Sequence, residues 1–505
     1  MQPEYIFETS WEVCNRVGGI YAVLSTRAAS MQQEHKDKVI FFGPDFGDHS
    51  NLTFKESKSL LKGWRPKGVR VGRWQVPGKP IAVLLKWDEV WAQKDAIYAH
   101  AWEKYGVQSH AAYGDYDESN MFAYAVGQLA ESLYNHLGQP TTAMHCNEWQ
   151  TAFTILYLKE HCPKIATLFT THATGIGRSI AGNYKPLYDC FHAFNGDQMA
   201  QELNMVSKHS VEKTAAHQAD CFTTVSNLTA RECAQLLDKP VDIVTPNGFE
   251  QGFVPQGKEF DAARKRARNT LISLARAKGI DAKGTDMLIG TAGRYEWKNK
   301  GIDVFLESLT RLGENFQQRS GLTAQGGLTS NSASGLKQVI AFVMIPYLDR
   351  PDFTIGNVHV VFVPTYLNGN DGVLNLPYYD LLIGLDLTVF PSYYEPWGYT
   401  PLESMAFHVP TITTSLSGYG VWCEEQGCTT IDKGVAVIYR NDSNTDDVIN
   451  HIVNTIEYYL SLTPRKVAAA RKAAVELALK AEWQHFFPYY RQAYAIALKK
   501  AAARQ

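Results

Sequence analysis

The sequence predicts an α/β protein with two domains, each built on a parallel β-sheet. Short apolar runs, rich in β-branched and aromatic residues, recur along its 505 residues and alternate with polar turns and helical patterns. Runs of this kind suit strands that are buried on both faces, as in a parallel sheet covered by helices. A chain of this length is also too long for one compact core. Two domains of alternating strands and helices are therefore expected.

Apolar runs mark the expected strands in both halves of the chain. In the first half they are KVIFFGPDF (38–46), PIAVLLKW (80–87), IATLFTTHATG (165–175), DCFTTVSN (220–227) and VDIVTPNGF (241–249). In the second half they are MLIGTAGRYEW (287–297), QVIAFVMIP (338–346), VHVVFVPT (358–365), LDLTVFPS (385–392), TITTSLSG (411–418) and GVAVIY (434–439). Ligands of open parallel sheets bind outside the carboxyl ends of the strands, so the loops after these runs are searched for functional residues.

The boundary between the domains is expected near residue 245, where a turn-rich Thr-Pro-Asn-Gly segment ends a strand. The expected N-terminal domain is residues 1–245, completed by the C-terminal helix 484–505. The expected C-terminal domain is residues 246–483.

Two local predictions concern the second half of the chain. From about residue 446 onward the chain is predicted to be helical, with Thr463 as a helix N-cap and Pro464 at the first helical position. Residues 320–337 contain few large apolar side chains and are predicted to form a flexible loop.

Composition and charge argue against several classes of protein. The formal net charge of −2 argues against a broad surface for nucleic acid. No apolar run approaches the roughly 18 residues of a membrane span, and the N-terminus lacks a secretory pattern. The eight cysteines form no CxxC pair, so free thiols in a reducing cytoplasm are expected. We therefore expect a cytoplasmic protein without nucleic-acid or membrane partners.

The segment YEPWGYTPLESMAF (394–407) places two carboxylates, Glu395 and Glu403, around a strand-to-helix turn. One interpretation is structural: Thr400 to Glu403 match a capping box, in which Glu403 would bind a backbone N–H. The other is functional. A helix N-terminus offers free N–H groups to a diphosphate, Gly398 allows close approach of a ligand, and carboxylates accept hydrogen bonds from sugar hydroxyls. The segment alone leaves both interpretations open.

Two further motifs follow predicted strands. In GRYEWKNKG, Arg294 and Lys300 bracket a turn, and two cations in one cleft would stabilise a leaving diphosphate. In FTTHATGIGRSIAG, His172 and Arg178 follow a strand in the same way. The alternatives are a solvated charged turn for the first motif and a structural histidine for the second.

Two glycines and two aspartates complete the candidates. Gly18 and Gly19 open a predicted helix, but the sequence has neither a GxGxxG dinucleotide motif nor a GxxxxGK[ST] phosphate loop. Asp115 and Asp117 look like the DxD metal site of some sugar transferases. Because they directly precede a helical pattern, acidic residues favoured by the helix dipole explain them better.

Together with neighbouring segments, these motifs give the chain a resemblance to a known family. It resembles the glycogen synthases of the animal and fungal type, glycosyltransferase family 3, over nearly its whole length. The segments that carry the resemblance are FETSWEVCNRVGGIYAVL, TTHATGIGR, CFTTVSNLTA, TPNGF, GRYEWKNKG and PSYYEPWGYTPLESMAFHVPTITTSLSGYG. The resemblance implies two Rossmann-like domains in the GT-B arrangement with an interdomain cleft, the N-terminal domain on the acceptor side and the C-terminal domain on the nucleotide-sugar donor side.

The resemblance also implies a reaction. Glucose would pass from UDP-glucose to the 4-OH at a non-reducing α-1,4-glucan end, with retention of configuration, on a glycogen or maltooligosaccharide acceptor. No metal or other cofactor is expected. The implied catalytic residues are Glu395, Lys300, Arg294 and Arg178. The implied donor-binding residues are Arg16, Gly18, Gly19, His172, Tyr378, Trp397, Gly398, Tyr399, Thr400 and Glu403.

Within this resemblance, individual roles follow from the matching residues. Glu395 would hold the donor glucose, and Glu403 would bind the ribose. Arg294 and Lys300 would grip the diphosphate, and Tyr378 would stack on uracil. A same-face attack, in which a phosphate oxygen of UDP accepts the proton of the acceptor hydroxyl, is the hypothesis for the chemical step.

Three departures from the family pattern affect what is expected. Asn147 stands where a histidine is usual and receives no assigned role. The C-terminal helix is mostly alanine, so Arg471 and Lys472 lack the arginine partners that bind glucose-6-phosphate in eukaryotic members. Only YLDRPDFTIGNVH fills the place of the helical insert that builds the eukaryotic tetramer. We expect an unregulated bacterial enzyme without that tetramer.

Other functions remain open at the level of sequence. A different nucleotide-sugar transferase or an epimerase on the same scaffold would share these motifs, and so would a glucan-binding scaffold without catalysis. An epimerase would convert the nucleotide sugar without a glucan. The sequence does not decide between UDP-glucose and ADP-glucose.

Overall fold

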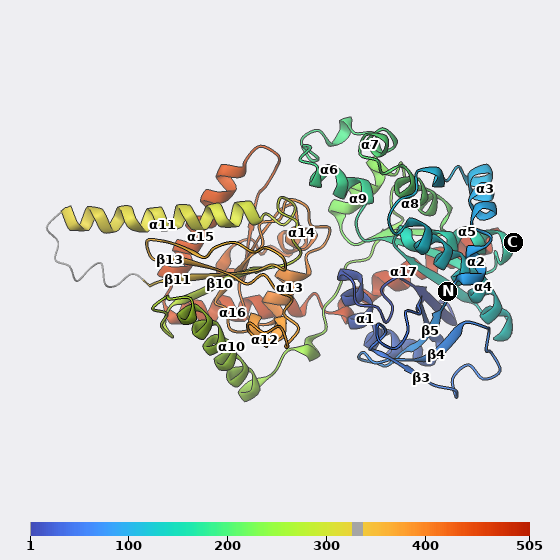
Figure 1. Cartoon of the computed structure of the whole chain (residues 1–505), viewed down its shortest axis with the longest axis horizontal. Coiled ribbons are helices and arrows are strands. Elements are labelled where there is room, and N and C mark those ends of the chain that lie inside the picture. The colour runs from blue at the N-terminus through green and yellow to red at the C-terminus, as the bar shows by residue number, and fades with distance from the viewer. Residues whose placement is uncertain (1, 326–336, 505) are drawn as a thin grey trace. The chain divides into compact units, whose positions relative to one another are not determined.

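The computed structural model describes residues 2–325 and 337–504, and Figure 1 shows the order of the elements. The chain forms two compact units. Unit 1 contains the residues up to Asn183, Cys190–Glu250, and the residues from Glu482 onward. Unit 2 contains Tyr184–Asp189 and Gln251–Ala481. The C-terminal segment therefore returns to the unit in which the chain begins.

Unit 1 is built on a sheet that has nine strands within the described residues, in the order β3-β4-β5-β2-β1-β6-β7-β8-β9. In this spatial order, neighbouring strands from β5 to β9 pair in parallel. At the other edge, β3 pairs with β4, and β4 with β5, in antiparallel fashion. The strands are β1 (Tyr5–Thr9), β2 (Val39–Pro44), β3 (Phe54–Glu56), β4 (Val69–Trp74), β5 (Ile81–Leu85), β6 (Thr142–Asn147), β7 (Ala166–Thr171), β8 (Cys221–Thr224) and β9 (Ile243–Val244). All residues of β2, β5, β6, β7 and β8 are buried, as parallel strands between helical layers require.

Helices cover this sheet and include the last helix of the chain. They are α1 (Gly19–His35), α2 (Asp88–Trp91), α3 (Lys94–Tyr105), α4 (Tyr116–His136), α5 (Ala152–His161), α6 (Gly175–Gly182), α7 (Gly196–Glu202), α8 (Val206–Gln218), α9 (Asn227–Leu236) and α17 (Trp483–Ala502). The indole N–H of Trp483, the first residue of α17, donates to the hydroxyl of Thr26 in α1 (2.9 Å). The C-terminal helix is thereby joined to the first helix.

Unit 2 contains a second sheet, with seven strands within the described residues in the order β12-β13-β11-β10-β14-β15-β16. All pairs are parallel except β12 with β13. The strands are β10 (Met287–Ala292), β11 (Val339–Met344), β12 (Phe353–Ile355), β13 (Val358–Phe362), β14 (Leu387–Val389), β15 (Thr411–Thr414) and β16 (Val435–Ile438).

The helices of unit 2 lie on both sides of its sheet. They are α10 (Gly257–Ala277), α11 (Ile302–Gln325), α12 (Tyr378–Leu382), α13 (Tyr399–Ala406), α14 (Gly418–Glu425), α15 (Thr445–Ser461) and α16 (Pro464–Leu479). In Figure 1, α11 and α15 lie on one side of the strands, and α10 and α12 on the other. The α/β class with two parallel-sheet units is confirmed.

Most local predictions are confirmed, and one is partly wrong. Every apolar run named above contains a strand, and the Thr463 side chain caps α16 with Pro464 in its first turn. The stretch 320–337 is not a loop throughout, because α11 continues to Gln325; residues 326–336 lie outside the described residues. Once a helix has formed, each further residue adds one backbone hydrogen bond, so the helix can extend at little cost. The lack of large apolar side chains after residue 320 therefore did not end α11 at that point.

Candidate active site

The carboxylate turn before α13 is fixed by backbone hydrogen bonds. The Glu395 N–H donates to the carbonyl of Leu416 (3.3 Å), and the Gly418 N–H donates to the carbonyl of Glu395 (3.0 Å). The Glu395 carboxylate forms an ion pair with the Lys300 ammonium, and their side chains are only 14% and 20% exposed. Such a partly buried pair is shielded from solvent and salt more than a surface pair.

The loop 293–301, which follows β10, is tied to the chain after β14. The carbonyl of Asn299 accepts hydrogen bonds from the N–H groups of Tyr393 and the next residue, at 2.9 and 3.1 Å. Gly301 has a φ of +64°, and a Cβ there would lie 1.9 Å from the carbonyl oxygen of Pro391. Only glycine permits this approach. The approach brings Lys300 to the carboxylate turn.

Arg294, at the other end of this loop, has a different partner. Its guanidinium pairs with Glu296 (2.7 Å) and its side chain is 55% exposed. The sequence interpretation treated Arg294 and Lys300 as two equivalent cations and did not include Glu296. Lys300 is the cation that pairs with Glu395. Arg294, nearer the start of the same loop, is an exposed cation that pairs with Glu296.

The capping-box interpretation of residues 400–403 is wrong. Helix α13 begins at Tyr399, and its N-cap is Gly398, with a φ of +112° and no side-chain cap. The Glu403 carboxylate is buried and accepts a hydrogen bond from the hydroxyl of Tyr379 (2.6 Å). A capping residue needs extended backbone and a side-chain acceptor, and here the left-handed glycine takes that position. Gly398, as the N-cap residue, therefore supplies no side-chain cap to the first turn of α13.

The remaining predicted residues of unit 2 surround this helix start. Trp397 is buried, and its carbonyl accepts hydrogen bonds from the Ser417 hydroxyl (2.9 Å) and the Tyr419 N–H (2.6 Å). Tyr378 begins α12, and its half-buried ring lies 5.8 Å from that of Tyr379. Tyr379 was missed by the sequence analysis, although the double tyrosine of LPYYDLL was visible.

In unit 1, His172 and Arg178 lie at the end of β7 and on α6. The His172 N–H donates to the Glu148 carboxylate (2.7 Å), and His172 Nε2 lies 3.0 Å from Asn147 Oδ1. The Thr174 side chain caps α6 by accepting the N–H of Gly177. These contacts fix the loop that joins His172 to Arg178.

The half-buried Glu148 and the buried Glu212 adjoin this loop. Burial raises the pKa of Glu148 to about 8 and that of Glu212 to about 7. A neighbouring carboxylate raises each pKa further, and the positive charge of Arg178 opposes both shifts. Perturbed carboxyl groups of this kind are typical of functional sites. Neither glutamate lies in a motif that the sequence singled out.

A carboxylate of the protein itself, that of Glu12, binds the N–H groups at the start of α1. Gly18 is the N-cap and Gly19 the first residue of α1, so the two glycines open a helix as predicted. The Glu12 carboxylate accepts the N–H groups of Gly18 (2.7 Å) and Tyr21 (2.8 Å). Arg16 is exposed and lies 5.9 Å from the ring of Tyr21. Glu12 was missed because only the folded loop brings it to the helix.

The Asp115–Asp117 pair belongs to a helix start, as the preferred interpretation held. Helix α4 begins at Tyr116; Asp117 pairs with Lys94 (3.0 Å), and Asp115 with Lys208 (2.7 Å). Across residues 2–325 and 337–504, no three His, Cys, Asp or Glu side chains gather as metal ligands. No helix of that part of the chain is long and apolar enough to cross a membrane.

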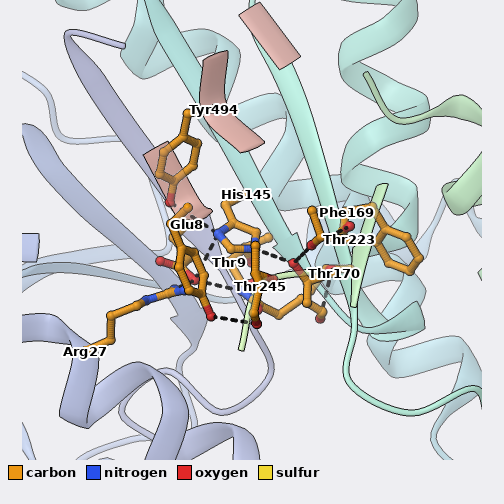
Figure 2. A network of polar contacts seen from close by, with 12 residues as sticks. Glu8, Thr9, Arg27, His145, Phe169, Thr170, Thr223, Thr245 and Tyr494 are labelled. Carbon is orange, nitrogen blue, oxygen red and sulfur yellow. Dashed lines mark hydrogen bonds and ion pairs between the residues drawn. The ribbon is translucent and has the colours of Figure 1, made fainter. Parts of the chain in front are cut away.

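A buried polar network adjoins Asn147 in unit 1, and Figure 2 shows its centre. Glu8 on β1 forms an ion pair with Arg27 on α1, and both side chains are almost fully buried. His145 on β6 contacts the Thr170 hydroxyl through Nε2 (2.7 Å) and the Tyr494 hydroxyl of α17 through Nδ1 (3.4 Å). Segments from both ends of the chain therefore meet at this network.

The predicted site residues thus form two groups, one on each unit. Unit 2 brings together Glu395, Lys300, Trp397, Gly398, Tyr399, Thr400, Glu403 and Tyr378, with Arg294 on the same loop as Lys300. Unit 1 holds Arg16, Gly18 and Gly19 at one helix start and His172 and Arg178 at another. Each group lies where loops follow the carboxyl ends of parallel strands, which is the usual place for ligands of such sheets.

Solved structures define the class of the fold. The chain is similar to the catalytic domain of starch synthase IV from Arabidopsis thaliana, with a TM-score of 0.61, 15% identity, and coverage of 98% of this chain and 99% of that one. Sucrose-phosphate synthase from Thermosynechococcus elongatus is similar with a TM-score of 0.54, 16% identity, and coverage of 98% and 100%. The fold is that of the GT-B glycosyltransferases, as predicted.

Sequence comparison defines the family. The profile of the glycogen synthase family matches residues 8–347 and 350–505, and the chain belongs to this family. It is 26% identical to the glycogen [starch] synthase of Neurospora crassa, over 98% of this chain and 84% of that protein. It is 27% identical to the human liver glycogen [starch] synthase, again over 98% and 84%. The chain is therefore a glycosyltransferase that transfers glucose from a nucleotide sugar, which confirms the predicted class of enzyme.

Proposed function

We propose that this enzyme transfers glucose from UDP-glucose to the 4-OH at the non-reducing end of an α-1,4-glucan, with retention of configuration. Glycogen or a maltooligosaccharide is the acceptor. The observation that carries the proposal is the shielded Lys300–Glu395 ion pair beside the start of α13, whose N-cap residue is Gly398. Relatives named glycogen [starch] synthase support the choice of acceptor.

The donor diphosphate is assigned to the start of α13. The first N–H groups of a helix have no intrahelical partner and attract anions. At the start of α13 these groups belong to Tyr399 and Thr400, and the N-cap residue before them is Gly398, which has no side chain. The Lys300 ammonium has three N–H donors, so it keeps one on Glu395 and offers the others to the phosphates.

The nucleoside is assigned to the other side of the same helix. Glu403, oriented by the Tyr379 hydroxyl, accepts hydrogen bonds from the ribose hydroxyls. The Tyr378 ring stacks on uracil. Trp397 acts by packing beneath the turn, because its side chain is buried.

The chemical step follows from these charges. The bond from C1 of glucose to the diphosphate oxygen breaks, and the acceptor O4 forms its bond to C1 on the same face. The O4 proton passes to the departing phosphate oxygen, so UDP is the second product. Lys300 and Arg294 neutralise the leaving diphosphate, and Glu395 stabilises positive charge near C1. No carboxylate pair for a double displacement is invoked.

Residues of unit 1 complete the assignment. His172 and Arg178 act on the donor from their loop and helix. Arg16, Gly18 and Gly19 form the first loop, where a phosphate gains the Gly18 N–H only in place of the Glu12 carboxylate. The proposal further includes a cytoplasmic location, to which the eight free cysteines are suited. It invokes no metal and no tetramer of the eukaryotic design.

The test is incorporation of labelled glucose from UDP-glucose and from ADP-glucose, each with and without glycogen, and with EDTA in a parallel series. We expect incorporation from UDP-glucose that requires glucan and withstands EDTA, with released UDP and new α-1,4 linkages. Conversion of UDP-glucose without glucan would identify an epimerase. Glycogen binding without turnover from any donor would identify a scaffold.

A further inference from the structure

The side-chain amide of Asn147 has only one orientation that its surroundings accept. Its Nδ2 donates to the Glu8 carboxylate (3.0 Å) and to the carbonyl of Thr9 (3.1 Å). Both partners are acceptors, and a carboxamide has two N–H donors. A flipped amide would turn its oxygen toward a carboxylate and a carbonyl. Oδ1 therefore faces the third neighbour, which is His172.

This orientation determines which ring nitrogen of His172 carries hydrogen. Nε2 of His172 lies 3.0 Å from Asn147 Oδ1, and an amide oxygen only accepts hydrogen bonds. Nε2 must therefore be the donor. The hydrogen bond made by one ring nitrogen fixes the tautomer of the other.

The ring is neutral. Burial lowers the pKa of His172 to about 3, and the positive charges of His145, when protonated, and of Arg27 act in the same direction. Glu8 acts in the opposite direction with a smaller effect. These groups lie on β6, α1 and β1, and the Glu148 carboxylate also contacts His172 by accepting its backbone N–H. With one proton on Nε2, the Nδ1 atom keeps a free lone pair.

Among the described residues, no group forms a hydrogen bond with the buried Nδ1 atom of His172. A buried acceptor without a partner is costly, and native proteins retain one mainly where a ligand or water uses it. Sugar hydroxyl groups are donors of the matching kind.

We propose that Asn147 is a positioning residue that fixes His172 as the neutral Nε2–H tautomer and thereby presents Nδ1 as the acceptor for a hydroxyl group of the bound sugar. The sugar part of this inference rests on the proposed function, whereas the tautomer does not. A site that accepts a hydroxyl hydrogen discriminates against an analogue without that hydroxyl. Asn147 stands where members of the family usually have a histidine. Through its contact with His172, it thus sets the specificity for the donor sugar.

The first experiment measures the tautomer in the whole protein labelled with ¹⁵N-histidine. We expect Nε2 of His172 to resonate as a protonated, pyrrole-type nitrogen and Nδ1 as an unprotonated, pyridine-type nitrogen. Neither signal should titrate near the ordinary pKa of about 6.5. A His172→Gln variant assigns the signals. A protonated Nδ1, or titration near neutral pH, would overturn the inference whether or not the protein transfers glucose.

The second experiment compares Asn147→Ala with Thr170→Val. Both changes remove a buried hydrogen bond of the same network, but Thr170 contacts His145 and not His172. Asn147→Ala should shift the ¹⁵N signals of His172 and lower kcat/KM for the donor roughly five- to tenfold, the effect of one lost neutral hydrogen bond. Thr170→Val should lower stability and leave both quantities unchanged. Unchanged His172 signals in Asn147→Ala would refute the positioning role.

A third comparison decides the matter if Asn147→Ala fails to fold. The oxygen of an asparagine at position 172 reaches the place of Nδ1, whereas a glutamine amide reaches the place of Nε2. His172→Asn should therefore retain several-fold more activity than His172→Gln. In parallel, UDP-sugars that lack one hydroxyl each should include one that wild type and His172→Gln use equally poorly. The reverse order of the two variants would contradict an acceptor at Nδ1. Absence of any transfer by wild type would instead refute the proposed function.

Discussion

The two groups of site residues use charge in opposite ways. In unit 2, Lys300 and Glu395 are charged, partly exposed and close to a helix start without a capping side chain. In unit 1, His172 is a neutral ring, held by Asn147 at the margin of a fully buried ion pair between Glu8 and Arg27. The first arrangement is ready to exchange partners with a charged ligand. In the second arrangement the buried charges bind other groups of the protein and thereby fix the orientation of a neutral ring.

This difference separates groups that bind charge from groups that orient an acceptor. Removing a charge from the partly buried pair of unit 2, Lys300 and Glu395, should change catalysis more than folding. Removing a charge from the buried pair should change folding first, because the remaining ion has no water to replace its partner. The predictions below test this division, from the largest expected effect to the smallest.

Breaking the buried pair should cost the most. Arg27→Met leaves the Glu8 carboxylate without its ion-pair partner and should lower the free energy of unfolding by about 3–5 kcal/mol. Chemical denaturation measures the loss. The control is Arg491→Ala, which removes the half-exposed pair with Glu34 (2.7 Å) and should cost less than about 1 kcal/mol. Equal losses in the two variants would contradict the distinction.

Removing the Lys300 ammonium should reduce turnover. Lys300→Ala should lower kcat at least about a hundredfold, because the charge that develops on the leaving diphosphate is no longer offset. The KM for glucan and the melting temperature should change little. Steady-state kinetics with Lys278→Ala as the control, which removes the ion pair with Asp352 (3.0 Å) elsewhere in unit 2, measures the effect. An unchanged rate would refute the assigned role of Lys300.

A smaller effect is expected at the carboxylate inside α13. Tyr379→Phe removes the hydroxyl that donates to Glu403 and should raise the KM for UDP-glucose roughly tenfold, with a smaller change in kcat. Tyr458→Phe removes a similar bond to Asp432 (2.9 Å) on an exposed part of unit 2 and serves as the control. If both variants kept the wild-type KM, Glu403 would not bind the nucleoside in the orientation assigned here.

The smallest effect is a dependence of stability on pH. Burial raises the pKa values of Glu148 and Glu212 in the folded state above their ordinary 4.5, so the folded state holds protons that the unfolded state has lost. The free energy of unfolding therefore falls as pH rises from about 4.5 toward 8. Buried His145 and His172, with lowered pKa values, act oppositely, but only below their ordinary 6.5.

Between pH 7 and 8 the carboxyl groups should dominate. We expect a loss on the order of 1 kcal/mol across this interval. Denaturation curves of wild type and Glu148→Gln measure it, since the neutral amide cannot titrate. The variant should lose less stability than wild type over the same interval. An identical slope in both proteins would show that Glu148 does not titrate there.

The sequence predicted the strands with continuous apolar or β-branched runs and missed strands that contain charged, imidazole or amide side chains. β1 and β6 escaped recognition because Glu8, His145 and Asn147 interrupt their apolar pattern, although all three side chains are buried. Those residues are satisfied by one another across neighbouring strands, which no local pattern reveals. The three-residue edge strands β3 and β12 were missed because half-exposed strands of this length have little apolar signal, and β4 was missed because its buried residues are interrupted by partly exposed ones.

The candidate site divides in the same way. Glu395, Lys300 and His172 were found because each lies in a contiguous motif after a strand. Glu12 and Tyr379 were missed because only the folded chain places them against Gly18 and Glu403. Asn147 was noticed as a departure from the family but given no role, since its role depends on the direction of its amide. Motifs identify groups that bind; tertiary contacts identify groups that orient them.

The central claim is that the paired charges of unit 2 support transfer of glucose with retained configuration. Its most direct test supplies UDP-glucose labelled with ¹³C at C1, together with a maltooligosaccharide, and follows the label by NMR. The account predicts that the label appears in a new α-1,4 linkage and that Lys300→Ala nearly abolishes this signal. A β linkage, or label that moves without an acceptor, would contradict it.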